Sequence, residues 1–192
     1  MTRAEAKNDK AVDLFAVRSL LFLPASNPRA IAKAREAGSD LVVLDLEDAV
    51  KADDKTAARK AAIEAVSESW PMPVAIRING IGTKWHSLDL DAAARSKADL
   101  VVLPRAISAH LVHGVAEAVN KPVLAMIETA AGVLAAAEIA QEAAAQRAQA
   151  ADPMEHTFAT LMLGYAQGDD LDVGSAETLD VPIRSVRELF PR

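Results

Sequence analysis

The stretch LVVLDLEDAV, residues 41–50, joins a run of strand-forming residues directly to Asp45, Glu47 and Asp48. A short continuous apolar run rich in valine and leucine predicts a strand that is buried on both faces. A carboxylate buried in a core is costly unless it is paired or binds a metal, whereas one at the mouth of a sheet can meet solvent and a ligand. The stretch therefore predicts a strand that leads into a site, provided that other strands end in the same way.

Short β-rich runs alternate with longer alanine-rich runs along the chain, which is typical of βα units around a parallel sheet. Six strands are expected, at residues 18–25, 40–47, 73–79, 98–105, 121–128 and 156–164. The first helix is expected to have Ser26 or Asn27 as its N-cap, Pro28 in its first turn and Gly38 as its C-terminal stop. Residues 130–151 are expected to form one long amphipathic helix.

The same five letters, DLVVL, open the segments at 40–44 and 99–103. A periodic barrel would produce such a repeat, but so would two buried parallel strands of a doubly wound sheet. The pattern therefore predicts an α/β fold and leaves both architectures open.

Polar residues stand at the ends of these expected strands. They are Asp45 and Glu47 in the second, Arg77 and Asn79 in the third, Arg105 in the fourth and Glu128 in the fifth, while the sixth ends in a turn led by Gly164. Ligands of βα folds bind at the carboxyl ends of the strands, so these residues are expected to meet at one rim. Contact with solvent explains any one of them, but five strand ends together favour a site.

The composition excludes several classes of function. The 192 residues, about half of them apolar, suit one globular domain or a large part of a bigger one, with residues 1–17 as a polar tail and 18–192 as the domain. The net charge of −6 argues against nucleic acid as a partner, although a few arginines can still hold a small anion. The chain has no cysteine, which excludes disulfides. Because neither a signal peptide nor a membrane span is evident, we expect a cytoplasmic protein without a membrane partner.

Several segments together resemble a known family. They are RSLLFLPASNPRAIAKAREAGSDLVVLDLEDAV (18–50), RIN (77–79), VVLPR (101–105) and AMIETAAGVLAAAEIA (125–140). In this order they are similar to the citrate lyase beta subunit and malyl-CoA lyase group of the HpcH/HpaI aldolase superfamily, and LDLEDAV and IETAAGV are the most specific of the motifs. The resemblance implies a TIM barrel that binds Mg2+, acts on a carbon–carbon bond beside a coenzyme A thioester and forms a homo-oligomer.

The resemblance also assigns roles to residues. Glu128 is expected to be a direct metal ligand, and Arg77 the cation over the thioester oxygen or carboxylate of the substrate. Glu47 and Asp48 match the family's acidic pair near the metal, and Arg105 is expected to help bind the substrate. Retro-aldol cleavage leaves an enolate, and Mg2+ with a guanidinium is suited to stabilising its charge.

Structural roles remain as alternatives for three of the strand-end residues. Arg77 could instead form an ion pair with Glu47 or Glu128, and Glu128 could instead cap the following helix. A strand-end hydrogen bond is the expected role of Asp45.

The sequence departs from the family after the sixth strand, where a second metal carboxylate is expected in a Gly-x-x-Asp-Leu pattern. In LGYAQGDDLDVG (163–174), Gln167 stands at that position. Asp169 or Asp170 is expected to replace the missing aspartate as a metal ligand, and the neutral carbonyl of Gln167 is the other candidate.

The chain is expected to provide strands one to six of the barrel only, and unpaired edges of such a sheet invite self-association. Three functions stay open. The first is a carbon–carbon lyase for a 3-hydroxyacyl thioester such as citryl-, malyl- or methylmalyl-CoA. The second is a non-catalytic acyl-CoA-binding or assembly subunit, and the third is an inactive fragment.

Overall fold

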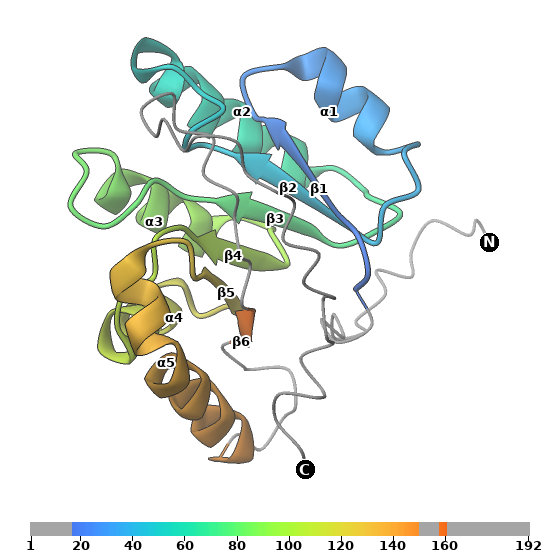
Figure 1. Cartoon of the computed structure of the whole chain (residues 1–192). Helices are drawn as coiled ribbons and strands as arrows, with labels where there is room; N and C mark the ends of the chain where they lie inside the picture. Colours follow the sequence, from blue (N-terminus) through green and yellow to red (C-terminus); the bar gives the residue numbers. More distant parts are fainter. Residues whose placement is uncertain (1–16, 150–157, 161–192) are drawn as a thin grey trace, which may run out of the picture.

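The computed structural model describes residues 17–149 and 158–160, and within them it forms one parallel sheet. The strands are β1 (Leu20–Pro24), β2 (Leu41–Asp45), β3 (Val74–Arg77), β4 (Leu100–Leu103), β5 (Val123–Met126) and β6 (Phe158–Thr160). They lie side by side in chain order, β1 to β6 (Figure 1). All six predicted strands are confirmed. The first five are shorter than predicted because the predicted spans included flanking loop residues, and the sixth is described only at residues 158–160.

Helices connect the successive strands. They are α1 (Pro28–Ala34), α2 (Lys55–Ser67) after a short 3-10 turn η1 (Ala52–Asp54), α3 (His86–Arg95), α4 (Ala109–Val119) and α5 (Ala130–Gln149). The Asn27 side chain accepts a hydrogen bond from the backbone N–H of Ala30, so the predicted N-cap of α1 is confirmed. The predicted stop at Gly38 was wrong, because α1 already ends at Ala34 and Gly38, with φ +70°, lies in the turn before β2.

The two faces of the sheet are covered differently. One hydrophobic cluster joins strand residues to residues of the helices. The buried residues of the other come from strands alone and are Leu41, Val43, Ala75, Leu100, Val102, Leu124 and Met126. A doubly wound sheet has helices on both faces and a reversal in its strand order. The described sheet has neither feature, which favours the wall of a barrel over a doubly wound sheet (Figure 1).

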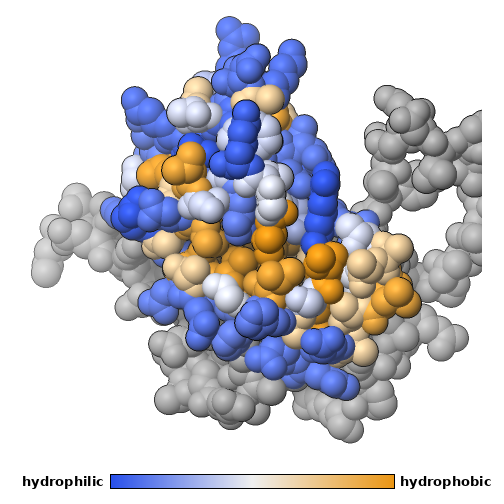
Figure 2. Space-filling model, turned by 90° about the vertical axis from the view of Figure 1, so that its left-hand side faces the viewer, coloured by the Kyte–Doolittle hydropathy of each residue, from blue (hydrophilic) through white to orange (hydrophobic). Residues whose placement is uncertain are grey.

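The strand register brings polar residues of neighbouring strands together. Asp45 pairs in register with Pro24 on one side and with Arg77 on the other. The loops that follow the strands lie on the left of Figure 1 and face the viewer in Figure 2. In the part of the chain that the structure describes, no helix has the length and apolar character needed to cross a membrane.

Candidate functional site

A buried ion pair joins the ends of β2 and β3. Arg77 Nε donates to Asp45 Oδ1 at 2.8 Å, and Arg77 Nη2 donates to Asp45 Oδ2 at 2.6 Å. The Asp45 side chain is 1% exposed and the Arg77 side chain 11%. Burial opposes the charge of Arg77, but the hydrogen bond and the charge of Asp45 outweigh it and raise the pKa of Arg77 above its ordinary value. The guanidinium is therefore a fixed cation at the sheet edge.

Asp45 also organises the turn at residues 45–49, which we call the rim turn. Its Oδ1 accepts the backbone N–H of Glu47 at 2.7 Å, and its Oδ2 accepts that of Ala49 at 3.0 Å. The strand-end hydrogen bond predicted for Asp45 is thus present. Its pairing with Arg77 was not predicted, because register across two strands cannot be read from a single segment. The turn places Glu47 and Asp48 beside the two arginines of the rim.

Glu47 is a buried carboxyl group between two arginines. It is 6% exposed, its Oε2 lies 3.3 Å from Arg77 Nη1, and its Oε1 lies 3.5 Å from Arg105 Nε. Among the described residues Oε2 has no hydrogen-bond partner. Burial raises the pKa of Glu47 to about 7, against the opposing charge of Arg77. The negative charges of Asp48 and Glu128 raise this pKa further. The predicted ion pair of Arg77 with Glu47 is present, and Glu47 can hold a proton near neutral pH.

Arg105 links the acidic residues of the rim. Its side chain is 60% exposed, and its Nη2 lies 3.6 Å from Asp48 Oδ1. Its backbone N–H donates to Glu128 Oε1 at 2.8 Å. The residue has φ +52°, in the left-handed region that is costly for a residue with a Cβ. This conformation turns the N–H toward Glu128 while the guanidinium reaches Glu47 and Asp48.

The alternative role of Glu128 as a cap of α5 was wrong. The carboxylate accepts the N–H of Arg105, whereas the first turn of α5 is capped by Thr129, whose Oγ1 accepts the N–H of Gly132 at 3.0 Å. A Cβ on Gly132 would lie 2.5 Å from the carbonyl oxygen of Ala106. The start of α5 therefore packs directly on the loop after β4. This close packing keeps Glu128, just before α5, next to Arg105 in that loop.

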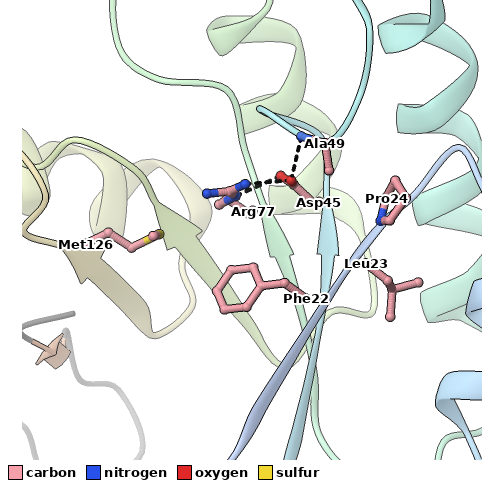
Figure 3. A pocket seen from close by; sticks show the side chains of 7 residues that line it. All are labelled: Phe22, Leu23, Pro24, Asp45, Ala49, Arg77 and Met126. Atoms are coloured by element: carbon pink, nitrogen blue, oxygen red, sulfur yellow. Dashed lines mark hydrogen bonds and ion pairs between the residues drawn. The ribbon is translucent and has the colours of Figure 1, made fainter. Parts of the chain in front are cut away.

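A cavity of about 280 Å³ opens beside the Asp45–Arg77 pair. It is lined by Phe22, Leu23, Pro24, Asp45, Ala49, Arg77 and Met126 (Figure 3). The guanidinium carbon of Arg77 lies 5.4 Å from the centre of the Phe22 ring. The cavity thus presents one cation among mainly apolar side chains. Sequence reasoning missed Phe22 and Met126, because alternation along a strand does not show which face lines a cavity.

Apolar side chains are also exposed on the face that Figure 2 shows, among charged ones. The large exposed ones among the described residues are Ile81, Leu88, Ile107, Val133 and Leu134. Residues 79–85, between β3 and α3, contain neither helix nor strand. This face therefore combines charged and apolar surface.

The described residues include no group of three side chains that could hold a metal ion. Glu128 could serve as one ligand of a metal ion. Its Oε1 accepts the N–H of Arg105, but its Oε2 has no hydrogen-bond partner among the described residues and could coordinate the ion. The other predicted ligands, Asp169 and Asp170, and the alternative Gln167 lie outside the described residues. The structure thus brings together Arg77, Glu47, Asp48, Arg105 and Glu128 and leaves the second metal ligand untested.

Comparison with known proteins gives one family match. Residues 18–152 match the family model described as HpcH/HpaI aldolase/citrate lyase. The chain is 42% identical over 127 residues to a (3S)-malyl-CoA thioesterase of Cereibacter sphaeroides, a match that covers 64% of this chain and 44% of the relative. It is 36% identical over 161 residues to an L-malyl-CoA/beta-methylmalyl-CoA lyase from that species, covering 76% and 50% of the two chains. The matches thus span about half the length of these relatives.

A solved structure shares the fold of the described sheet. It is the protein CitE of Mycobacterium tuberculosis in complex with magnesium, acetoacetate and coenzyme A. The TM-score is 0.55 and the sequences are 42% identical, with 63% of this chain and 43% of that chain covered.

Proposed function

Because the chain belongs to the HpcH/HpaI aldolase/citrate lyase family, we propose that it acts on the coenzyme A thioester of a small 3-hydroxy acid as a Mg2+-dependent carbon–carbon lyase. Malyl-CoA and methylmalyl-CoA are the leading candidates, because the names of its relatives contain them. The observation that supports this proposal best is the orientation of Arg77 by Asp45 beside an apolar-walled cavity.

Arg77 is the residue that we propose to bind the reacting end of the acyl group. Asp45 occupies Nε and one N–H of Nη2, so we propose that Nη1, which lies 3.3 Å from Glu47 Oε2, donates to a substrate oxygen beside Glu47. Phe22 and Met126 would pack against the carbon chain and exclude water from it. A guanidinium held in this way stabilises negative charge on a thioester oxygen without having to reorient.

The acidic residues are proposed to share two tasks. Glu128, with Asp169 or Asp170, would hold Mg2+, which when bound stabilises the developing charge of an enolate. Glu47 would hold a proton near the reacting atoms, since its pKa of about 7 lets it exist in both forms at neutral pH. Asp48 and Arg105 would fix the outer side of the site, where the exposed Arg105 can meet an anionic part of the thioester.

Hydrolysis of the thioester is the second candidate, and the identity to a (3S)-malyl-CoA thioesterase favours it. The same arginine would then polarise the thioester carbonyl for attack by water. Binding without turnover is the remaining alternative, since the match spans about half the length of the relatives.

The complete fold and assembly are also part of the proposal. We propose that the described sheet belongs to a TIM barrel and that the chain forms a homo-oligomer in the cytoplasm. Light scattering after size-exclusion chromatography would test the assembly, and a stable monomer at micromolar concentration would contradict it.

The function is tested by incubating the chain with (3S)-malyl-CoA and Mg2+ and measuring glyoxylate and free thiol separately. A lyase releases glyoxylate and acetyl-CoA, whereas a hydrolase releases malate and a free thiol. Arg77→Lys keeps the charge but not the forked pairing, and we expect it to lower turnover by about 10²-fold. The matched control is Arg95→Lys on the exposed part of α3, which should retain activity. If the wild type binds no coenzyme A thioester, the proposed function is wrong.

A further inference from the structure

A buried lysine lies beneath the rim turn. Lys55 is the first residue of α2 and is 6% exposed. Its Nζ donates to the backbone carbonyls of Leu46 at 2.7 Å and Glu47 at 2.6 Å, and to Asn79 Oδ1 at 2.7 Å. Two of these acceptors belong to the turn that presents Glu47 and Asp48. The ammonium thus contacts the backbone of the rim turn and not the side chains of that turn.

All the donors of this ammonium are in use. A lysine ammonium has three N–H groups, and three oxygens lie within hydrogen-bond distance of Nζ. Burial lowers the pKa of Lys55, and the charges of Asp45 and Glu47 oppose that change. A buried and saturated ammonium has no donor left for a substrate, so any effect on the site must act through the groups that it holds.

The rim turn is held from two sides by opposite charges. The carboxylate of Asp45 accepts the N–H groups of Glu47 and Ala49. The ammonium of Lys55 takes the carbonyl oxygens of Leu46 and Glu47. Without Lys55 the Glu47 carbonyl would keep only the N–H of Val50 and the Leu46 carbonyl only the side-chain amide of Asn79. Each carbonyl would lose its charge-assisted hydrogen bond, which is the stronger kind.

The support of Lys55 extends into a buried polar network. The side-chain amide of Asn79 donates to Leu46 O at 2.9 Å and also to Asp89 Oδ2. Asp89 in turn accepts from Arg59 Nε at 2.6 Å. Arg59 lies one turn after Lys55 on α2 and shares this network, but none of its observed contacts involves the rim turn. It is therefore a matched control.

We propose that Lys55 is a positioning residue, whose hydrogen bonds to the carbonyls of Leu46 and Glu47 set where the carboxylates of the rim turn sit against Arg77 and Arg105. The effect on the backbone does not depend on the proposed function. The effect on ligand binding rests on the proposed function.

Hydrogen exchange of the full chain tests the backbone effect in Lys55→Met and Arg59→Met. The reporters are the amides of Glu47 and Ala49, and the β4 amide of Val101, which donates to Pro122 O, corrects for global stability. We expect Lys55→Met to lower the protection of the rim amides by about tenfold relative to Val101, as for the loss of a charged hydrogen bond. Arg59→Met should leave this ratio unchanged. An unchanged ratio in Lys55→Met, or an equal fall in both variants, would overturn the proposal.

Calorimetry with (3S)-malyl-CoA and Mg2+ tests the effect on the ligand. Lys55→Met should weaken binding by about tenfold, whereas Arg59→Met should bind like the wild type. Equal affinities in both variants would refute a positioning role in binding. If the wild type itself does not bind, the proposed function fails and hydrogen exchange alone decides the role of Lys55. Should Lys55→Met not fold, Lys55→Gln, which keeps a donor without the charge, takes its place in both measurements.

Discussion

The two ends of β2 have the same ion-pair chemistry in opposite surroundings. At its start Asp40 accepts from Nε and Nη2 of Arg18 at 3.2 and 2.9 Å, and also from the backbone N–H of Ser19. At its end Asp45 accepts from the same two atoms of Arg77 and from two backbone N–H groups. The Arg18 side chain is 85% exposed, whereas that of Arg77 is 11% exposed.

Because one ion pair is exposed and the other buried, the two differ in their contribution to the stability of the fold. An exposed pair is screened by water and salt and adds little to stability. A buried pair must repay the desolvation of both charges, and apolar residues of similar volume often serve stability as well. Since the fold can close a strand end with an exposed pair, as it does at Asp40, stability alone does not account for the buried pair at Asp45. The binding of a ligand to Arg77, as proposed above, would account for it.

The largest effect should follow from breaking the buried pair. Asp45→Ala leaves the buried Arg77 guanidinium with only the more distant Glu47, at 3.3 Å, and removes the acceptor of two backbone N–H groups. We expect the free energy of unfolding to fall by about 3–5 kcal/mol. Urea denaturation followed by circular dichroism measures it. A loss no larger than that of Asp40→Ala would show that burial does not distinguish the two ends.

The next largest effect concerns pH, through Glu47. Its folded pKa of about 7 exceeds the ordinary value of 4.5, so between these values the folded state binds more protons than the unfolded state. The contribution of Glu47 to stability is therefore fully present below about pH 4.5 and is lost as the pH rises through about 7. The loss is about 3 kcal/mol by linkage.

Glu47→Gln should remove this dependence and be more stable than the wild type at pH 8, with the difference vanishing at low pH. The contribution of Asp40, at the other end of β2, should change with pH in the opposite direction. Arg18 holds the pKa of Asp40 well below its ordinary value, so its contribution is present above the ordinary pKa and is lost as the pH falls. Urea denaturation between pH 2 and 8 gives both slopes, because that of Asp40 lies below its ordinary pKa of 3.8. Parallel curves for the wild type and Glu47→Gln would contradict the burial of Glu47.

Strand pattern and strand-end chemistry were predictable from the sequence, because apolar runs and the polar residues that follow them are local features. The same reasoning failed where contacts are distant. The pairing of Asp45 with Arg77 depends on strand register, and the burial of Lys55 depends on how α2 packs beneath the rim turn. Helix α3 was not predicted, since apolar and polar residues alternate from Ser87 to Asp91 with the period of a strand.

Tight packing at the C-terminal end of the sheet should also extend to α5. A Cβ at Gly132 would approach the Ala106 carbonyl oxygen to 2.5 Å, and backbone atoms cannot give way cheaply. We expect Gly132→Ala to lower the free energy of unfolding by about 1–3 kcal/mol. The matched control is Gly114→Ala in α4, where a Cβ would meet no atom within 4 Å. That variant should gain up to about 1 kcal/mol from helix propensity. Thermal melts that show the same sign for both would contradict the close packing of α5.

The smallest effect should come from the exposed pair at the start of β2. Arg18→Ala removes the partner of Asp40, but that carboxylate keeps the backbone N–H of Ser19 and remains open to water. The Debye length falls from about 10 Å at 0.1 M salt to about 3 Å at 1 M, which is close to the 2.9 Å separation of this exposed pair. Raising the salt concentration should therefore erase most of the difference in stability between Arg18→Ala and the wild type. We therefore expect the stability of Arg18→Ala to converge on that of the wild type at 1 M sodium chloride, while Asp45→Ala stays destabilised there because salt screens the largely buried Arg77 only weakly. Urea denaturation of the three proteins at 0.05 and 1 M salt measures this. If Arg18→Ala stayed destabilised at high salt, the pair at Asp40 would act like a buried one, and the contrast that supports the proposed ligand site at Arg77 would lose its basis.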